Sequence, residues 1–194
     1  MPNFDGTTAS AKTRYAVARN KVIPQDSWHT LAGRTSVLTK GTFDVLHAGH
    51  LALLAHCFEE ARSLGANSAV VVVVESDESV RQRKGKFRPF QDEGQRTMQM
   101  ALLQGVDFVI VAGKAELGAV LAELRPSVYV KGMDTAVAGP LGDADGQAVV
   151  LPPASNPELA LISWPCKVVV FTDDGSLSTS SLTKQIAAKL GELP

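Results

Sequence analysis

The sequence has few cysteines, little net charge and no long apolar run. Cys57 and Cys166 are too few for a disulfide scaffold or a cysteine-rich zinc site, which favours a cytoplasmic setting. No stretch approaches the roughly 18 consecutive apolar residues of a transmembrane helix, and no secretory signal is expected because residues 1–20 contain no apolar segment. The formal net charge of -1 provides no long-range attraction to nucleic acid or an anionic membrane, so neither is an expected partner.

Length and composition predict a single globular domain. Hydrophobic residues make up 45% of the 194 residues and charged residues 20%, as is usual for globular proteins. Residues 1–20 are polar and aperiodic, which predicts a loose N-terminal tail. Residues 21–194 are expected to form the domain, with a Pro/Gly-rich insertion at about 135–166. This insertion either reshapes substrate choice or is an inert surface segment.

Strand and helix patterns alternate along the domain. The valine-rich run 69–74 is typical of a strand that is buried on both faces. The other predicted strands are 36–39, 108–111, 128–131 and 167–171. A short helix is predicted after Pro24, and longer helices over 50–64, 92–103, 115–124 and 180–190. Residues 81–89 are predicted to form a basic loop. The alternation predicts an α/β fold, a Rossmann-like three-layer αβα arrangement around a five-stranded parallel sheet. Ligands of such sheets bind beyond the carboxyl ends of the strands.

A histidine pair stands in the loop after the first predicted strand. His47 and His50 are three residues apart and directly precede an amphipathic helix, so both rings can face one ligand at the helix N-terminus. That terminus favours phosphate, and two imidazoles there can donate hydrogen bonds to a phosphoryl group in its transition state. Gly41 permits a close backbone approach in the same loop.

Two simpler interpretations of the pair remain open at this point. One histidine can be an ordinary loop residue or a helix cap. A two-histidine metal site is the other interpretation, but His29 and His56 do not have ligand spacing with the pair, and no metal ligand is predicted.

The stretch Gly41-Thr42-Phe43-Asp44, followed by His47-Ala48-Gly49-His50, resembles the signature of the cytidylyltransferase-like nucleotidyltransferases. The resemblance covers roughly residues 36–190. It implies that loop amides and both histidines hold a nucleoside triphosphate while an acceptor phosphate attacks the α-phosphorus and pyrophosphate leaves. His47 and His50 would then stabilise the transition state.

The resemblance implies further site residues in the other loops. Lys86 would be catalytic, chosen over its neighbour Lys84, while Lys84 and Arg88 would bind substrate phosphate. Asp134 would accept a hydrogen bond or hold a Mg²⁺-bound water. The complete set implied to bind the nucleotide is Gly41, Thr42, Phe43, Asp44, Gly49, Arg96, Lys131, Gly132, Asp134, Ser178, Thr179 and Ser180.

Two subfamilies compete for the substrates. The loop from Ser79 to Pro89 and the stretch from Val130 to Asp134 resemble the adenylyltransferase domain that makes ADP-heptose from ATP and D-glycero-D-manno-heptose 1-phosphate. The alternative is a glycerol-3-phosphate cytidylyltransferase, whose expected arginine is missing from the stretch Phe171–Gly175. The resemblance also implies Mg²⁺ dependence and a homodimer. A nucleotide-binding regulator without catalysis is the alternative of another class.

Overall fold

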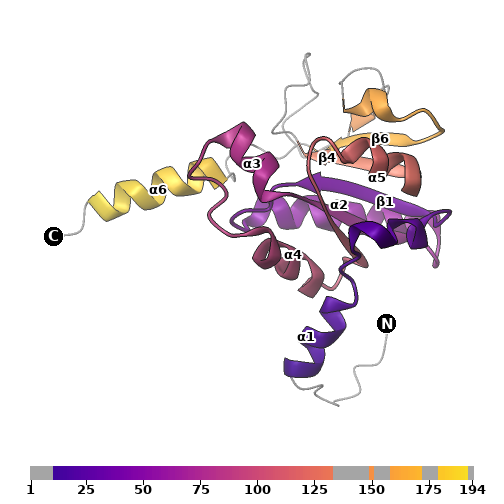
Figure 1. Cartoon of the computed structure of the whole chain (residues 1–194), viewed down its shortest axis with the longest axis horizontal. Coiled ribbons are helices and arrows are strands. Elements are labelled where there is room, and N and C mark those ends of the chain that lie inside the picture. The colour runs from indigo at the N-terminus through magenta and orange to yellow at the C-terminus, as the bar shows by residue number, and fades with distance from the viewer. Residues whose placement is uncertain (1–10, 133–148, 151–157, 172–178, 192–194) are drawn as a thin grey trace.

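Five parallel strands form the centre of the molecule. The computed structural model describes residues 11–132, 149–150, 158–171 and 179–191 (Figure 1). Within them the sheet order is β3-β2-β1-β4-β6, and the two-residue strand β5 adds an antiparallel pair at the β6 edge. The strands are β1 (Ser36–Gly41), β2 (Ala69–Glu75), β3 (Phe108–Ala112), β4 (Val128–Gly132), β5 (Val149–Val150) and β6 (Lys167–Phe171). The predicted five-stranded parallel sheet is confirmed.

Helices cover both faces of the sheet. Alternate residues of β2 pack against α2 and α4 on one face and against α5 and η1 on the other, and all seven β2 residues are buried. The two cores explain why the valine run shows no polar alternation. The described helices are α1 (Ala11–Arg19), η1 (Gln25–Leu31), α2 (Ala48–Leu64), α3 (Asp77–Lys84), α4 (Glu93–Leu102), α5 (Leu117–Leu124), η3 (Leu159–Leu161) and α6 (Thr179–Gly191).

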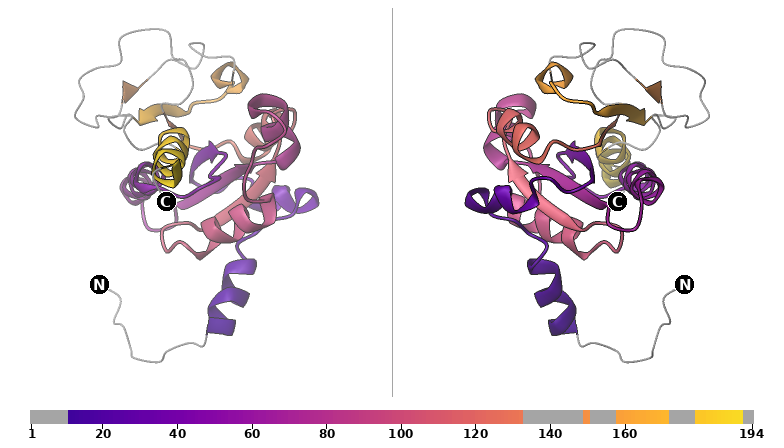
Figure 2. Two further views of the ribbon diagram at one scale, coloured as in Figure 1. Left: turned by 90° about the vertical axis from the view of Figure 1, so that its left-hand side faces the viewer. Right: turned by 90° about the vertical axis from the view of Figure 1, so that its right-hand side faces the viewer.

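The segment before β1 is more ordered than the sequence predicted. Residues 11–19, assigned to a loose tail, form α1 (Figure 2). Ala18 is buried in the core on the α2–α4 side. Val22 then forms a parallel bridge with Val109 at the sheet edge, while Lys21 Nζ donates to the carbonyls of Leu103 (3.2 Å) and Val106 (2.7 Å). Residues 11–19 are thus helical where a loose tail was predicted, and the contacts of Lys21 and Val22 attach the segment that follows to the sheet. Residues 1–10 lie outside the described residues.

The predicted basic loop over 81–89 begins as a helix. The Ser76 side chain accepts a hydrogen bond from the Ser79 amide at the start of α3. The first turn carries Asp77 and Glu78, and the last turn is basic, which complements the helix dipole. Helix formation therefore extends to Lys84, and the loop begins at Gly85, which has a φ of 94°.

The strand order reverses between β1 and β4. From β1 the chain moves outward to β2 and β3, then returns to the other side of β1 with β4 and β6. The carboxyl ends of β1 and β4 therefore meet at the switch point, where open α/β sheets bind ligands. Helix α6 projects from the body near this end (Figure 1). Among the described residues, no helix combines the length and apolar character that a membrane span requires.

Candidate functional site

The histidine pair lies where β1 leads into α2. His47 immediately precedes the helix, and its carbonyl accepts hydrogen bonds from the amides of His50 (3.0 Å) and Leu51 (3.3 Å). The imidazole rings of His47 and His50 are stacked, with centroids 3.8 Å apart and planes 26° apart. The His47 side chain makes no helix-capping hydrogen bond. Gly49, which stands between the two histidines in the sequence, is buried. Both rings therefore gather at the positive end of the helix, as the sequence predicted.

The environment of His50 favours its neutral form. Burial lowers its pKa from 6.5 to about 4, with smaller contributions from His47 and Lys84, although a hydrogen bond with the Val45 backbone acts in the opposite direction. A neutral imidazole retains one N–H donor. At neutral pH the ligand-free His50 is therefore uncharged and carries a single N–H donor.

Gly41 and Phe43 shape the loop between β1 and α2. Phe43 has a φ of 50°, and its fully buried ring lies beside Gly41. A Cβ at Gly41 would come within 2.9 Å of that ring. The ring of Phe43, which was predicted to bind nucleotide, faces the core. Its contribution is thus to the loop conformation, which leaves the backbone as the part available to a ligand.

Thr42 is held by an ion pair between the buried Glu75 and the exposed Arg83. Its hydroxyl donates to Glu75 Oε2 (3.0 Å) and accepts from Arg83 Nη2 (3.0 Å), while Arg83 Nη2 lies 2.5 Å from the same carboxylate oxygen. Burial alone would raise the pKa of Glu75, but hydrogen bonds from Arg83 and Ser79 outweigh it and lower the pKa to about 2. The roles of Glu75 and Arg83 were not predicted from the sequence. The signal available was a carboxylate that ends the buried strand and a basic run shortly after it.

Asp44 organises the chain that follows α3. Its buried carboxylate accepts hydrogen bonds from the amides of Phe90 (2.7 Å) and Gln91 (3.0 Å) and forms an ion pair with Arg88 Nε (3.2 Å). The Arg88 guanidinium also lies over the Phe90 ring, 4.3 Å from its centroid. Asp44, predicted to bind nucleotide, is therefore engaged in holding Arg88 and the loop in place.

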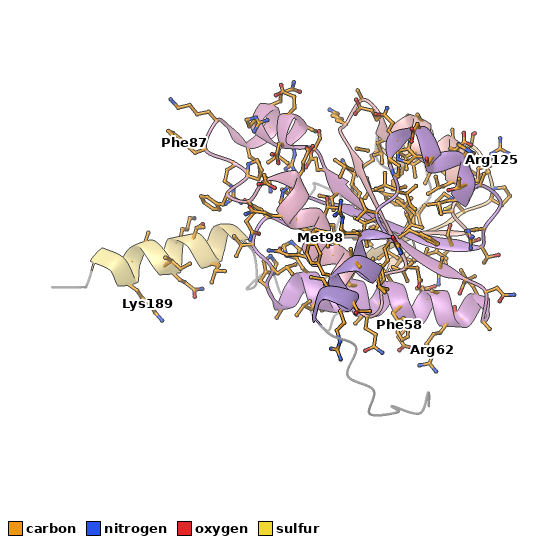
Figure 3. The ribbon with its side chains drawn as sticks, turned by 60° about the horizontal axis from the view of Figure 1, so that its bottom comes forward. Phe58, Arg62, Phe87, Met98, Arg125 and Lys189 are labelled. Carbon is orange, nitrogen blue, oxygen red and sulfur yellow. The ribbon has the colours of Figure 1, made fainter. Side chains whose placement is uncertain are left out.

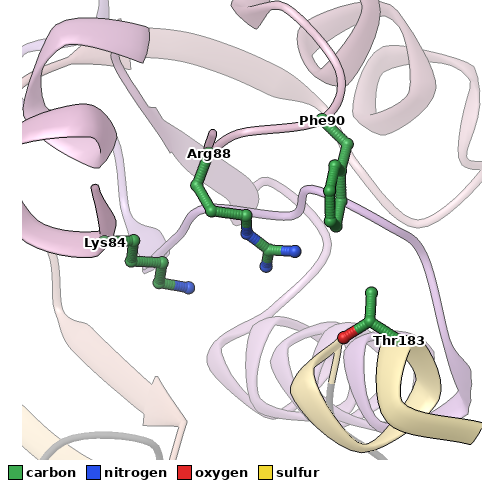
Figure 4. A pocket seen from close by; sticks show the side chains of 4 residues that line it. All are labelled: Lys84, Arg88, Phe90 and Thr183. Carbon is green, nitrogen blue, oxygen red and sulfur yellow. The ribbon is translucent and has the colours of Figure 1, made fainter. Parts of the chain in front are cut away.

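An open cavity of about 430 Å³ lies beside this loop, lined by Lys84, Arg88, Phe90 and Thr183. Figure 4 shows the Lys84 ammonium and the Arg88 guanidinium pointing into the same space, with the Phe90 ring and Thr183 of α6 on its other side. Lys84 also contributes to lowering the pKa of His50, so its positive charge is felt at the histidine pair. The cavity therefore combines two cations with a flat apolar surface next to the pair.

Lys86 does not line this cavity. It is exposed, and its ammonium lies over the ring of Phe87, 4.9 Å from the centroid. Figure 3 shows Phe87 at the outer tip of the loop, where 78% of it is exposed. Lys84 lines the cavity because α3 continues to it, whereas Lys86 lies beyond the turn at Gly85, and the catalytic role of Lys86 stays a prediction.

Arg96 is wholly buried, although the sequence analysis expected it to reach a phosphate. It donates to the Thr42 carbonyl (2.6 Å), the Gln91 carbonyl (3.0 Å) and Asp77 Oδ1 (2.6 Å), with 0% of the residue exposed. These contacts join the histidine loop to α3 and α4. In the structure Arg96 acts on the site through Thr42, so the expected direct contact is corrected.

Lys131 and Gly132 end β4 beside β1. The Lys131 ammonium is hydrogen-bonded to Glu158, which also accepts from Lys40 Nζ at 3.0 Å. Burial would raise the pKa of Glu158, but Lys40 and Lys131 together lower it below its usual value. Part of the predicted insertion thus reaches the carboxyl edge of the sheet, through ion pairs with Lys40 and Lys131 that the sequence did not indicate.

Other predicted site residues cannot be placed. Asp134 and Ser178 lie outside the described residues, and for Thr179 and Ser180 the structure describes only the backbone at the start of α6. Within the described ranges no three His, Cys, Asp or Glu side chains gather as a metal site.

The model of the family called cytidylyltransferase-like matches residues 38–145, more than half of the chain. The chain belongs to this family. The nucleotidyltransferase assignment made from the sequence is thereby confirmed, and the matched region contains the histidine pair, the Thr42 network and the cavity loop.

This cytidylyltransferase-like chain is similar to proteins named bifunctional protein HldE. Identity is 44% over 123 residues with that of Streptomyces coelicolor, covering 61% of this chain and 25% of the relative. With that of Photobacterium profundum it is 36% over 159 residues, covering 82% and 29%. The chain spans only about a quarter of these relatives.

A solved structure supports the fold of the cytidylyltransferase-like chain. The crystal structure of the lipopolysaccharide core biosynthesis protein from Thermoplasma volcanium has a TM-score of 0.53 and 24% identity, over 73% of this chain and 98% of that one. The Rossmann-like prediction is confirmed by this likeness and by the parallel sheet.

The low pKa of His50 predicts a pH-dependent stability. Between about pH 6.5 and pH 4 the unfolded chain binds a proton at this position and the folded chain does not, so stability is lost as the pH falls through this window. We expect His50 to stay neutral to about pH 5 in an NMR titration of the ligand-free protein. His50→Gln should lose less stability than the wild type between about pH 7 and pH 5. A wild-type His50 that titrates near 6.5 would contradict the expectation.

Proposed function

We propose that this chain transfers a nucleoside monophosphate from a nucleoside triphosphate to an acceptor phosphate. An acceptor phosphate oxygen attacks the α-phosphorus, the bond from that phosphorus to the β-phosphate oxygen breaks, and pyrophosphate leaves with its electron pair. The observation that carries this proposal is the stacked His47–His50 pair at the N-terminus of α2. Two fixed donors there suit the negative charge that spreads over the phosphoryl oxygens in the transition state.

The surrounding residues supply position and charge. The backbone from Gly41 to Asp44, with Gly49, would face the triphosphate, because Thr42 and Asp44 are held by ion pairs behind it. Lys84 and Arg88 would bind a substrate phosphate in the open cavity, since both cations point into it. By family resemblance, Lys131, Gly132 and Asp134 would lie near the base and ribose, and Ser178, Thr179 and Ser180 would form a second phosphate clamp.

The proposed substrates are ATP and D-glycero-D-manno-heptose 1-phosphate, giving ADP-heptose. Support comes from the similarity to bifunctional HldE proteins and from the loop between Ser79 and Pro89. CTP with glycerol 3-phosphate remains the alternative pair.

The described residues contain no cluster of carboxylate side chains that could bind Mg²⁺ directly. The two buried carboxylates nearest the histidine loop, Asp44 and Glu75, are both paired with arginines. Mg²⁺ often keeps several waters and binds through substrate phosphates, so the nucleotide would be its main ligand here. A homodimer is proposed on family resemblance alone.

The test is pyrophosphate release with Mg²⁺, crossing ATP and CTP with the heptose 1-phosphate and glycerol 3-phosphate. We expect turnover with ATP and the heptose phosphate, at a rate at least about tenfold above the other three combinations. Turnover with CTP and glycerol 3-phosphate would move the chain to the alternative pair. Nucleotide binding without release in any combination would instead indicate a regulator.

A further inference from the structure

Three charged side chains meet at the switch point of the sheet, outside the histidine site. Lys40 is on β1 and Lys131 on β4, each one residue beyond the register pair Thr39–Val130. Glu158, just before η3, bridges them: Oε1 accepts from Lys40 Nζ at 3.0 Å, and Oε2 accepts from Lys131 Nζ. The cluster thus joins two neighbouring strands to a segment 27 residues beyond Lys131.

The cluster carries an excess positive charge in a largely buried place. The side chains of Lys40, Lys131 and Glu158 are 14%, 8% and 19% exposed. Two ammonium groups share one carboxylate, and buried charges are costly unless each is compensated. Lys40 also contributes to lowering the pKa of Glu75. Because Glu75 already pairs with Arg83, the Glu75 carboxylate does not balance the excess positive charge of the two lysines.

The two ammonium groups have hydrogen-bonding capacity to spare. Each has three N–H donors, and Glu158 accepts one from each. Within the part of the chain that the structure describes, neither group has a second acceptor. Counted over the described residues, the two lysines have unused donors and one charge in excess, which suits an oxyanion that lysine binds as a point charge.

We propose that Lys40 and Lys131, the latter assigned to the nucleotide by resemblance, form an anion-binding subsite for a phosphate oxyanion, and that Glu158 occupies it until the ligand arrives. Its position at the reversal of strand order places it where sheets of this kind bind ligands. The carboxylate keeps the lysines in place, and a phosphate oxygen would take over their donors as Glu158 withdraws. The proposal concerns binding and does not depend on the transfer reaction.

The test is titration calorimetry of the full chain with two probes, inorganic pyrophosphate and glycerol 3-phosphate. The first represents nucleotide phosphates and the second an acceptor phosphate. In Glu158→Gln the competing negative charge is gone, so we expect one of the two probes to bind about tenfold more tightly. That probe identifies the source of the phosphate. In Lys40→Met with Glu158→Gln the gain should disappear.

A matched control uses another lysine–glutamate pair. Glu60→Gln removes the same charge from the Lys167–Glu60 pair, in which Lys167 Nζ and Glu60 Oε1 lie 2.7 Å apart. Lys167 is the first residue of β6, at the end of the sheet away from the lysine cluster. This substitution should leave the affinities for both probes unchanged. If Glu158→Gln fails to fold, Glu158→Asp keeps the charge but is too short to bridge both lysines, and it should still bind the probe more tightly than the wild type.

Equal affinities in the Glu158 and Glu60 variants would overturn the subsite, as would a gain that persists without Lys40. These results would leave the proposed transfer intact, because pyrophosphate release tests it separately. Conversely, a chain without transferase activity that still shows the Lys40-dependent gain would retain the subsite and lose the proposed function.

Discussion

Replacing either His47 or His50 with alanine should lower turnover by about 100-fold or more while leaving the fold intact. The two rings are stacked 3.8 Å apart at the N-terminus of α2, so an N–H of each can reach the phosphoryl oxygens of one substrate. The measurement is kcat from pyrophosphate release with the substrate pair that proves active, alongside the circular dichroism spectrum of each variant.

His29→Ala is the matched control, because His29 is an exposed histidine of η1 on the other side of the sheet. It should retain wild-type turnover. If the histidines act in the transition state, kcat should fall more than KM rises. The double variant should lose less than the product of the two single effects, since the rings contact one another. Wild-type turnover in either single variant would eliminate the assigned role.

The strands were predictable because burial dictates their composition. A run such as Val70–Val74 has few alternatives to a central parallel strand, and its predicted ends agree closely with β2. The histidine pair was predictable for a related reason. Its spacing and its place between a strand and a helix fix the position of both residues without knowledge of the rest of the chain.

The partners of the charged residues were less accessible from the sequence. Lys40 and Glu158 are 118 residues apart, and Thr42 and Arg83 are 41 apart, so chain spacing contains no signal for either contact. The same limitation affected Asp44, whose carboxylate turns toward the amide of Phe90. A motif identifies which residues gather, whereas packing decides which side chains face a ligand and which hold the backbone.

The lysine choice shows how a helix boundary changes a site. A loop over 81–89 leaves Lys84 and Lys86 equivalent, so the choice between them had no physical basis. Extending α3 through Lys84 places that residue at the cavity, and Gly85 then directs Lys86 toward the exposed Phe87 ring. The signal was present in the acidic start and basic end of the segment, which favour a short helix.

Arg96→Met should lower the free energy of unfolding by about 3–5 kcal/mol. Arg96 is fully buried, and removing its guanidinium leaves the Asp77 carboxylate and the Thr42 carbonyl without a donor that each now has at 2.6 Å. Losing three hydrogen bonds of a fully buried guanidinium, one of them to a partly buried carboxylate, costs far more than the loss of a surface ion pair. The measurement is chemical denaturation of the variant and the wild type under identical conditions.

Arg81→Met provides the control, because Arg81 is exposed and lies 4.0 Å from the same Asp77 carboxylate. Its loss should cost about 1 kcal/mol at most. Arg96→Lys should recover little stability, since one ammonium cannot reproduce the planar fork that reaches Thr42, Gln91 and Asp77. Turnover of Arg96→Met should also fall at a temperature where it remains folded, because the Thr42 carbonyl loses its anchor next to the histidine loop. Equal destabilisation by the Arg96 and Arg81 variants would show that the buried network does not hold this loop.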